Sequence, residues 1–403
     1  MFVWQVFLAC AEVMMNFQGA KKRVILMACV LIILALTQRS RADFDISVFI
    51  DNFENNDKQT VLAGPIDLLV LERGPARFEL RSGNLTLADF GCKLPLAMVF
   101  QGRVNFTYRP PDAIECYQLH KFTGQDTLIC EFDDITFFWT VPPEGLPDSS
   151  LLTRQAIEKA AWKKIKDAQK DALDYMGIYL PNALAGDLVS ASQDTFFYAD
   201  FAIKKFEQLV FRDNQLKDDR YSLCKLRQTS GHKTYDVYGA FSPDGTSLLS
   251  ARGLLPIDIT HYNLNVYIEN NFDLQIESQM YFVPLRNDRK YIHFDWYYDT
   301  VPISMSDANN EPIRWLKHKD ENGLGLALNQ PMVVGETTFV NLTYECRGLR
   351  TCGECFFLTA SIRGIQPTDT TIGPRSMSPS IAAKTMKLSA AASRSKLMRP
   401  TAD

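Results

Sequence analysis

The chain has 403 residues, of which 46% are hydrophobic and 22% charged, as in an ordinary globular protein large enough for two or three domains. The formal net charge is −4, so the chain lacks the basic excess that nucleic-acid binding requires, and no nucleic-acid partner is expected. Its cysteines are too sparse for a scaffold that depends on disulfides.

The N-terminus carries the features of a targeting signal. Lys21, Lys22 and Arg23 are followed by 13 apolar residues, 24–36, which would span about 20 Å as a helix, too short for the hydrocarbon core of a bilayer. The small residues Ser40 and Ala42 suit a signal peptidase. Residues 1–42 are therefore predicted to be a signal peptide with an upstream extension. The mature chain is expected to be exported to the periplasm or beyond the cell, and to be membrane-anchored only if this segment stays uncleaved.

Residues 43–245 are predicted to form an N-terminal β-rich domain. Short apolar runs such as 66–71 and 135–141 are separated by turn residues, which is typical of strands. Gln101-Gly102-Arg103 is interpreted as a hairpin-like break between two such runs. Asp112 is expected to cap a short helix that follows it.

Residues 148–176 are predicted to be an amphipathic helix inserted in this domain. Apolar residues recur there at steps of three to five positions, from Leu152 to Ala172. Lysines alternate with acidic residues on the remaining surface, which indicates a solvated, salt-bridged face rather than a membrane or nucleic-acid surface.

Residues 253–346 are predicted to form a second domain of short alternating strands. Leu264, Val266 and Ile268 fall on one face of the first strand, and the same alternation returns in the later runs. The predicted fold class is mainly β with some helix (α+β), with two antiparallel β-sandwich or saddle-like domains. An immunoglobulin-like module fits the periodicity of the second domain equally well.

The residues of this second region resemble a known family. His261-Tyr262-Asn263-Leu264 comes first, the turn from Gln330 to Glu336 precedes the closing strand, and Leu342-Thr343-Tyr344 lies in that strand. In this order and spacing, these motifs resemble the N-terminal β-domain of aminopeptidase N-like zinc metallopeptidases. The resemblance covers Leu254 to Cys346, and it implies a fold but no catalytic residue. Residues 100–124 look like an extra N-terminal β-domain found in some exported bacterial relatives.

The catalytic motifs that this resemblance implies are absent from the sequence. Such peptidases bind zinc through an HExxH helix and a later Glu, and they bind the substrate's α-amine through a Gly-x-Met-Glu-Asn loop. None of the histidines is followed by Glu or has a second histidine four positions away; they are His120, His232, His261, His293 and His318. We therefore predict no catalytic, cofactor-binding or metal-binding residue in this chain. Zinc is expected only in full-length relatives.

Adjacent carboxylates and one Cys-x-x-Cys pair are the remaining candidates for chemistry. The adjacent carboxylates are Asp133-Asp134, Asp218-Asp219 and Asp320-Glu321, which lie among turn residues and are expected to be solvated. Cys352-Gly353-Glu354-Cys355 has the spacing of a redox pair but lacks the strand-to-helix setting of thioredoxin-like motifs. Local disulfide pairing or free thiols are expected there instead.

Residues 361–403 are rich in Ser, Thr, Ala, Pro and basic residues, and they are predicted to be a disordered basic tail. The alternation of apolar and polar residues is lost after Cys346, partway through the domain that the resemblance implies. We therefore predict a non-catalytic N-terminal portion of an exported aminopeptidase-like protein, truncated before the HExxH domain. The alternative is a stand-alone exported β-sandwich module that binds a peptide, glycan or protein partner.

Overall fold

The computed structural model describes residues 46–358 and 387–390, with gaps. The gaps are 56–58, 93, 190–195, 205–206, 215–218, 230–231, 243–256, 269–272, 286, 288–289, 297–299, 322, 347–348 and 353–354. The expected signal peptide of residues 1–42 and the turn between the two predicted domains lie outside the described residues. Among the helices of the described part, none is long and apolar enough to cross a membrane.

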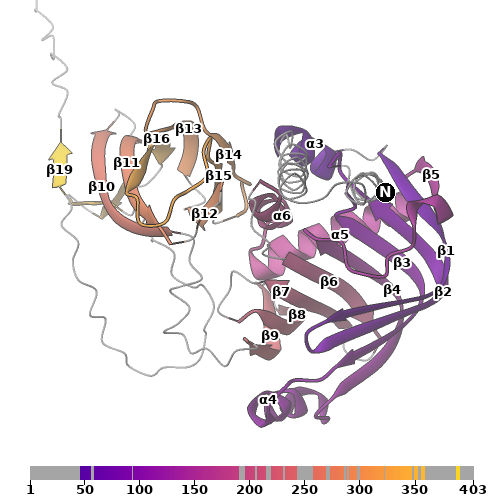
Figure 1. The fold of residues 1–403 in the computed structure, drawn as a ribbon. Helices are drawn as coiled ribbons and strands as arrows, with labels where there is room; N and C mark the ends of the chain where they lie inside the picture. The colour runs from indigo at the N-terminus through magenta and orange to yellow at the C-terminus, as the bar shows by residue number, and fades with distance from the viewer. Residues whose placement is uncertain are drawn as a thin grey trace, which may run out of the picture. The chain divides into compact units, whose positions relative to one another are not determined.

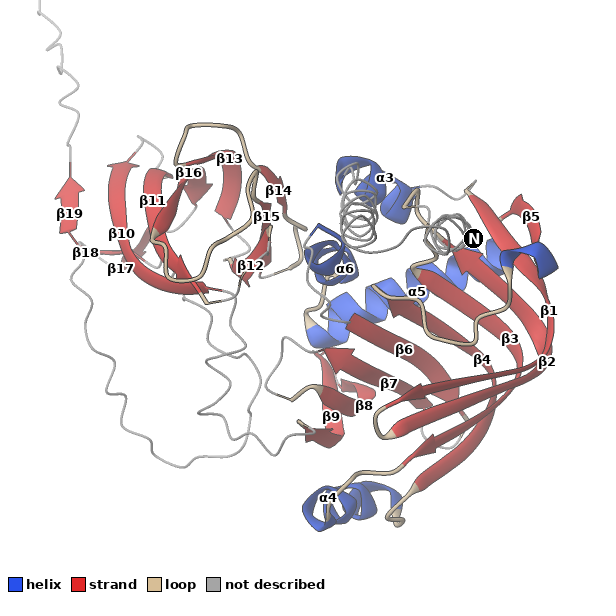
Figure 2. Ribbon diagram, in the orientation of Figure 1, coloured by secondary structure: helices blue, strands red, loops and turns tan. Residues whose placement is uncertain are grey.

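The described residues form mostly antiparallel sheets with a few helices, so the predicted mainly β fold is confirmed (Figure 2). The α-helices are α3 (Ile46–Asn55), α4 (Ala113–Thr123), α5 (Lys159–Met176) and α6 (Leu180–Val189), and a short 3₁₀ turn covers Ser149–Leu151. Of the two forms that the sequence left open, the N-terminal region is one curved sheet and the C-terminal region is a two-sheet sandwich.

A nine-stranded antiparallel sheet, here called the curled sheet, forms the N-terminal region (Figure 1). Its strands, in spatial order, are β5 (Thr153–Ala156), β1 (Thr60–Arg73), β2 (Ala76–Ala88), β3 (Ala97–Tyr108), β4 (Leu128–Trp139), β6 (Phe196–Ile203), β7 (Glu207–Asn214), β8 (Tyr221–Thr229) and β9 (His232–Phe241). Nearly all neighbours in the sheet are also neighbours in sequence, and only β5 returns to pair with β1.

The curvature of this sheet follows from contacts between its aromatic residues. Phe78 on β2 is fully buried, and its ring centroid lies 4.8 Å from that of Phe106 on β3 and 6.1 Å from that of Phe211 on β7. Strands β2 and β7 are four positions apart, which would separate them by about 19 Å in a flat sheet. The sheet therefore curls around its own aromatic core, which also contains Phe137 and Phe197.

Helices α3 and α5 cover the opposite face of the curled sheet. The ring of Phe53 on α3 lies 5.9 Å from that of Phe138 on β4. Lys164 on α5 forms an ion pair with Asp134 of the same strand, at 2.6 Å between Nζ and Oδ1. Helix α5 buries Ala161, Ile165 and further alanines on this side. The sheet thus has two buried faces, one filled by its own rings and one covered by helices.

Helix α5 is shorter than the predicted helix at residues 148–176. It begins at Lys159, and residues 153–156 form the edge strand β5, paired with β1. The amide of Ile157 also donates to the carbonyl of Gln59, at 3.0 Å. Sheet pairing with a distant strand therefore overrides the helical spacing of Leu152 and Ala156. The predicted salt-bridged surface is present, with Lys163 and Asp167 paired one turn apart.

Residues 101–103 form no hairpin, contrary to the prediction. Strand β3 continues through them, and the break in pattern is a bulge, since the register with β2 shifts between Arg81 and Gly83. A Cβ at Gly83 would lie 2.4 Å from the carbonyl oxygen of Gln101 and 2.5 Å from the ring of Phe100. Glycine is thus required there because two strands and a ring approach closely.

The predicted short helix after Asp112 and the predicted cap at Asp112 are both confirmed. The carboxylate of Asp112 caps α4 by accepting from the amides of Ile114 and Glu115, at 2.9 Å each. The helix ends at Thr123, and Gly124 follows it in the left-handed conformation with a φ of 75°.

The C-terminal region is a sandwich of two sheets. The larger sheet has the order β13 (Thr300–Asp307), β16 (Thr338–Cys346), β11 (Leu274–Pro284), β10 (Ile257–Ile268) and β19 (Lys387–Ala390), and the smaller has β12 (Tyr291–Asp295), β15 (Gly323–Ala327) and β14 (Arg314–Leu316). Their inner faces share one core, which includes Met280, Phe294, Leu326 and Leu342. The alternation is regular, since every second residue of β11 is buried from Leu274 to Pro284.

The chain beyond Cys346 is described only in short pieces. Strands β17 (Leu349–Cys352) and β18 (Cys355–Leu358) form a hairpin in which Cys352 and Cys355 are backbone partners. No helix follows this Cys-x-x-Cys pair within the hairpin, as the sequence indicated. Within the predicted disordered tail, residues 387–390 form β19, which pairs in parallel with β10. The rest of residues 361–403 lies outside the described residues, so a disordered tail stays a prediction.

Candidate functional site

A chain of buried polar contacts joins α6 to the smaller sheet of the sandwich. The hydroxyl of Tyr291 on β12 donates to the side-chain oxygen of Asn182 on α6. The amide nitrogen of Asn182 donates to Oε2 of Glu321, at 2.5 Å. The other oxygen of Glu321 lies 3.4 Å from Nε2 of His293. Asn182, Tyr291 and Glu321 are each 3% exposed, so three of these four groups are removed from water.

Two glycines on β15 create the space for this network. A Cβ at Gly325 would lie 1.7 Å from the hydroxyl oxygen of Tyr291 and 2.5 Å from Oδ1 of Asn182. A Cβ at Gly323 would lie 2.5 Å from Nε2 of His293. Between these glycines, Leu324 points into the sandwich core. The sequence Gly-Leu-Gly-Leu therefore buries leucines on one side and admits polar side chains on the other.

The loop that carries Glu321 is held by its own contacts. The Lys317 ammonium donates to the backbone carbonyls of His318, at 3.0 Å, and of Glu321. The ring of His318 lies 4.7 Å from that of Tyr179, and the hydroxyl of Tyr179 donates to a carboxylate oxygen of Glu54. Burial lowers the pKa of Lys317, and the charge of Glu321 opposes this shift. These contacts fix the carboxylate of Glu321 in place.

The chemistry available in this network is limited. Burial, with a further contribution from Glu321, raises the pKa of Tyr291 well above its usual range, so the phenol is a neutral hydrogen-bond donor. His293 and Glu321 are arranged as an imidazole and its orienting carboxylate, but a hydrolytic dyad also needs an activated nucleophile. Within the described part of the chain, the pair makes its polar contacts with Asn182 and Lys317, neither of which supplies a hydroxyl or a thiol. The network is therefore best explained as a structural connection between α6 and the sandwich.

Most of the histidines lie on separate elements. His120 pairs with Asp126, His261 stacks on Tyr281, and His318 packs on Tyr179. The backbone of His232 begins β9, and its side chain is outside the described residues. Among the side chains that the structure describes, no three of the His, Cys, Asp and Glu groups are placed to hold a metal ion. The prediction that this chain has no catalytic or metal-binding residue stays a prediction.

Glu321 is the residue that sequence analysis missed. The pair Asp320-Glu321 was expected to be solvated, but only Asp320 is exposed, while Glu321 is buried. Its partner Asn182 is 139 positions away in the sequence. The sequence did contain one signal of this burial, the glycines at 323 and 325. A glycine inside a strand indicates that other side chains pack closely on that face.

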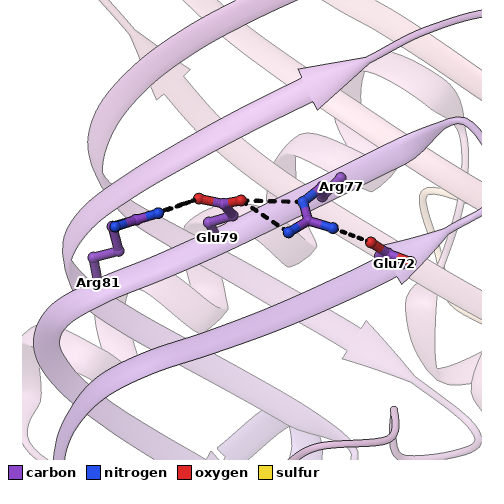
Figure 3. A network of polar contacts seen from close by, with 4 residues as sticks. All are labelled: Glu72, Arg77, Glu79 and Arg81. Carbon is purple, nitrogen blue, oxygen red and sulfur yellow. Dashed lines mark hydrogen bonds and ion pairs between the residues drawn. The ribbon is translucent and has the colours of Figure 1, made fainter.

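Figure 3 shows a second charged network, on the exposed side of strands β1 and β2. Arg77 bridges Glu72 and Glu79, with Nη2 lying 3.0 Å from Oε1 of Glu79. Arg81 binds the other oxygen of Glu79 at 2.7 Å. Bonds from Arg81 and Arg77 lower the pKa of Glu79. Two cations and two anions neutralise one another here, so this network offers no net charge to a ligand.

Asp200 on β6 is a buried acid that forms no ion pair with a described residue. It is 4% exposed, and burial raises the pKa of its carboxyl well above the usual range, with Asp171 of α5 adding repulsion. Gln208 donates to Oδ1, while Oδ2 has no hydrogen-bond partner among the described residues. The neutral, protonated acid is therefore the form that this site favours.

Asp200→Asn should stabilise the protein at neutral pH. The folded-state pKa of Asp200 lies above the unfolded value of 3.8, so folding binds a proton and stability falls as the pH rises above that value. An amide cannot ionise, so we expect the free energy of unfolding at pH 7 to rise by about 1–3 kcal/mol, with little change at pH 4. Chemical denaturation at the two pH values measures this difference.

Asp213→Asn is the matched control, and it should have the opposite effect. Asp213 is equally buried, but its oxygens lie 2.7 and 3.4 Å from Nε and Nη2 of Arg220. Removing its charge leaves the cation without its partner, so this variant should lose stability at pH 7. A stability loss in Asp200→Asn at pH 7 would contradict the assignment of a protonated Asp200.

Comparison with solved structures shows a weak likeness to M1 zinc metallopeptidases. The M1 zinc metallopeptidase from Deinococcus radiodurans matches with 19% sequence identity and a TM-score of 0.20, over 23% of this chain and 20% of that chain. The same values hold for its mutant bound to a Tyr-Ser-Ala substrate and for a two-domain M1 zinc metallopeptidase mutant bound to L-arginine. This chain thus spans about a fifth of the length of the structures it matches. No protein-family model and no curated protein sequence matches it.

The likeness bears out the predicted relationship only as a weak structural resemblance to part of these enzymes. At this coverage and TM-score it does not place the chain in the family, and it transfers no activity. The more specific assignment, an N-terminal β-domain of an aminopeptidase N-like enzyme, stays a prediction from the sequence motifs.

Proposed function

We propose that the sandwich is a non-catalytic scaffold domain related to the N-terminal β-domain of aminopeptidase N-like zinc metallopeptidases. The observation that carries this proposal is that each motif of the resemblance occupies a structural position in the sandwich. His261 to Leu264 lies in β10, paired with Tyr281 to Ser278 of β11. Leu342 to Tyr344 lies in β16, which pairs with β11 and β13.

The turn between residues 330 and 336 supports the same reading. Met332 is buried, Gly335 has a φ of 82°, and the amide of Gly335 donates to the carbonyl of Pro284 at 3.3 Å. The amide of Val334 donates to the side chain of Asn287 at 2.9 Å. The glycine is needed for the left-handed conformation, and the turn positions β16 against β11. Such a role is structural, as the resemblance implies.

Peptide hydrolysis separates a scaffold from an active peptidase. Incubated with equimolar zinc and aminoacyl-methylcoumarinamide substrates, the purified chain is expected to release no coumarin above a protein-free control, because the sequence contains no HExxH motif. A catalytically active zinc aminopeptidase, assayed in parallel, is the positive control. Turnover that is abolished by a chelator and restored by zinc would contradict the proposal.

The proposed truncation has a separate test in the gene. The motivating observation is the loss of strand alternation after Cys346. Reading the nucleotide sequence past that codon in the other two frames should reveal an HExxH helix if a frame shift separates the sandwich from a zinc domain. A downstream sequence without HExxH in either frame would remove the support for truncation.

The second candidate is a stand-alone exported binding module. It is favoured by one observation, the polar, sparsely charged outer face of the larger sheet of the sandwich. Export is supported by Lys21 to Arg23 and the apolar run that follows. The partners that we propose for such a module are a peptide, a glycan or a protein.

A further inference from the structure

The outer face of the larger sheet carries two ordered rows of side chains across adjacent strands. In the first row, the ring centroids of His261 and Tyr281 lie 4.1 Å apart with an interplanar angle of 11°, and those of Tyr281 and Phe339 lie 5.0 Å apart. These three residues are direct cross-strand partners on β10, β11 and β16. The rings therefore stand side by side as one continuous ridge.

The second row runs beside the first and consists of amides and a hydroxyl. Asn263 donates to Gln279 at 3.4 Å, Gln279 donates to Asn341 at 3.0 Å, and Asn341 donates to Ser306 at 3.2 Å. The hydroxyl of Tyr281 also donates to Oε1 of Gln279, at 3.2 Å, which links the two rows. This row spans four strands, from β10 to β13, in direct register.

The charge on this face is sparse and acidic. Strands β10, β11, β13 and β16 contain no lysine or arginine, and the fifth strand, β19, brings one lysine, Lys387, into register with Asn263. Glu277 and Glu345 are exposed on the side of the amide row away from the rings. Binding of nucleic acid or of an anionic membrane needs a cluster of basic side chains, so this face suits neither.

The two rows are fixed before any ligand arrives. Asn263 uses a donor in the row, whereas Gln279 and Asn341 each use both a donor and an acceptor. An amide side chain has two donors and two lone pairs in total, so the acceptor of Asn263 adds to the hydrogen-bonding groups of this face. Asn263 is exposed and Gln279 half-buried, so groups of both kinds reach the surface. A rigid array of this sort loses little conformational entropy when it binds.

From this combination, we propose that the outer face of the larger sheet binds a neutral polysaccharide. A sugar chain presents many hydroxyls, which both donate and accept hydrogen bonds, together with apolar C–H edges. The amide row matches the hydroxyls, the exposed ring edges of the aromatic ridge match the C–H groups, and the scarcity of basic residues matches a ligand without negative charge. This inference goes beyond the scaffold role, and it holds or fails independently of peptide hydrolysis.

Affinity electrophoresis tests the proposal with the full chain. Native gels would contain hydroxyethylcellulose, xylan, laminarin or soluble starch as neutral probes, and polygalacturonate as the anionic probe. We expect at least one neutral polysaccharide to retard the protein and polygalacturonate not to do so. Asn263→Ala and Tyr281→Ala should each weaken the apparent affinity about fivefold or more, the value of one lost hydrogen bond.

Trp315→Ala is the matched control, because Trp315 is also an exposed aromatic residue but lies on β14 of the smaller sheet. It should leave the retardation unchanged. Thermal unfolding of each variant identifies any loss that comes from misfolding, and Asn263→Ala, at an exposed position, is the variant expected to retain the wild-type Tm. The proposal is overturned if no neutral probe retards the wild type. It is also overturned if a folded Asn263→Ala and a folded Tyr281→Ala are retarded as strongly as the wild type.

Discussion

Asn182→Ala should lower the free energy of unfolding by about 2–4 kcal/mol. The variant removes the donor to Oε2 of Glu321 and the acceptor of the Tyr291 hydroxyl, and both of those groups stay buried. A buried carboxylate without its hydrogen bond stays desolvated with nothing to compensate. The free energy of unfolding therefore falls by more than it would for a single exposed contact. Equilibrium denaturation of the full chain, followed by tryptophan fluorescence, measures it.

Asn329→Ala is the matched control for this prediction. Asn329 also donates to a carboxylate, that of Asp307 at 2.9 Å, but the contact is exposed, and its loss should cost about 1 kcal/mol or less. A double-mutant cycle with Tyr291→Phe should give a coupling energy of about 1 kcal/mol or more, since the two residues share a hydrogen bond. If Asn182→Ala were no more costly than Asn329→Ala, the network would not join α6 to the sandwich.

Phe78→Ala should be the most destabilising single truncation in the curled sheet, at about 3–5 kcal/mol. Its ring contacts those of Phe106, Phe137, Phe201 and others across the curled face, and it is fully buried. Those neighbours belong to several strands of the curved sheet, so they cannot close the cavity without changing the curvature of the sheet. Urea denaturation midpoints and slopes would report this loss.

Phe122→Ala provides the comparison for the same substitution at the surface. The ring of Phe122 on α4 stacks on Tyr238 at 4.9 Å, but it is 39% exposed, so its loss should cost about 1 kcal/mol or less. Equal costs for the two variants would contradict the description of Phe78 as the centre of a closed aromatic core.

The sandwich could be predicted well from the sequence because its strands alternate. One face of each strand is buried, so Leu264 and Val266 on β10, or Leu324 and Leu326 on β15, reveal their strands directly. The cap at Asp112 is equally local, since a side chain and an amide two residues later decide it.

The features that could not be predicted depend on distant partners. Residues 153–156 have a helical pattern, but they pair with β1 almost a hundred positions away. Gly102 looks like a turn residue, but the approach of Gly83 on the neighbouring strand makes it part of a bulge. The curvature that brings Phe78 to Phe211 is likewise set by the whole sheet and by no single segment.

The candidate site was hidden for the same reason. Glu321 lies in a turn with Asp320, where charge and neighbours both indicate exposure. Its burial depends on α6, which brings Asn182 to it from the other region of the chain. By contrast, the absence of basic residues from β10, β11, β13 and β16 could be read directly from the sequence.

Zinc stoichiometry tests the central claim most directly, because a scaffold without metal ligands and a peptidase differ in bound metal before any substrate is added. The purified chain would be dialysed against micromolar zinc, and bound metal would be counted by mass spectrometry of the protein fraction. A non-catalytic scaffold should retain well below one zinc ion per chain. One tightly held zinc ion per chain, together with cleavage of an aminoacyl substrate, would contradict this account.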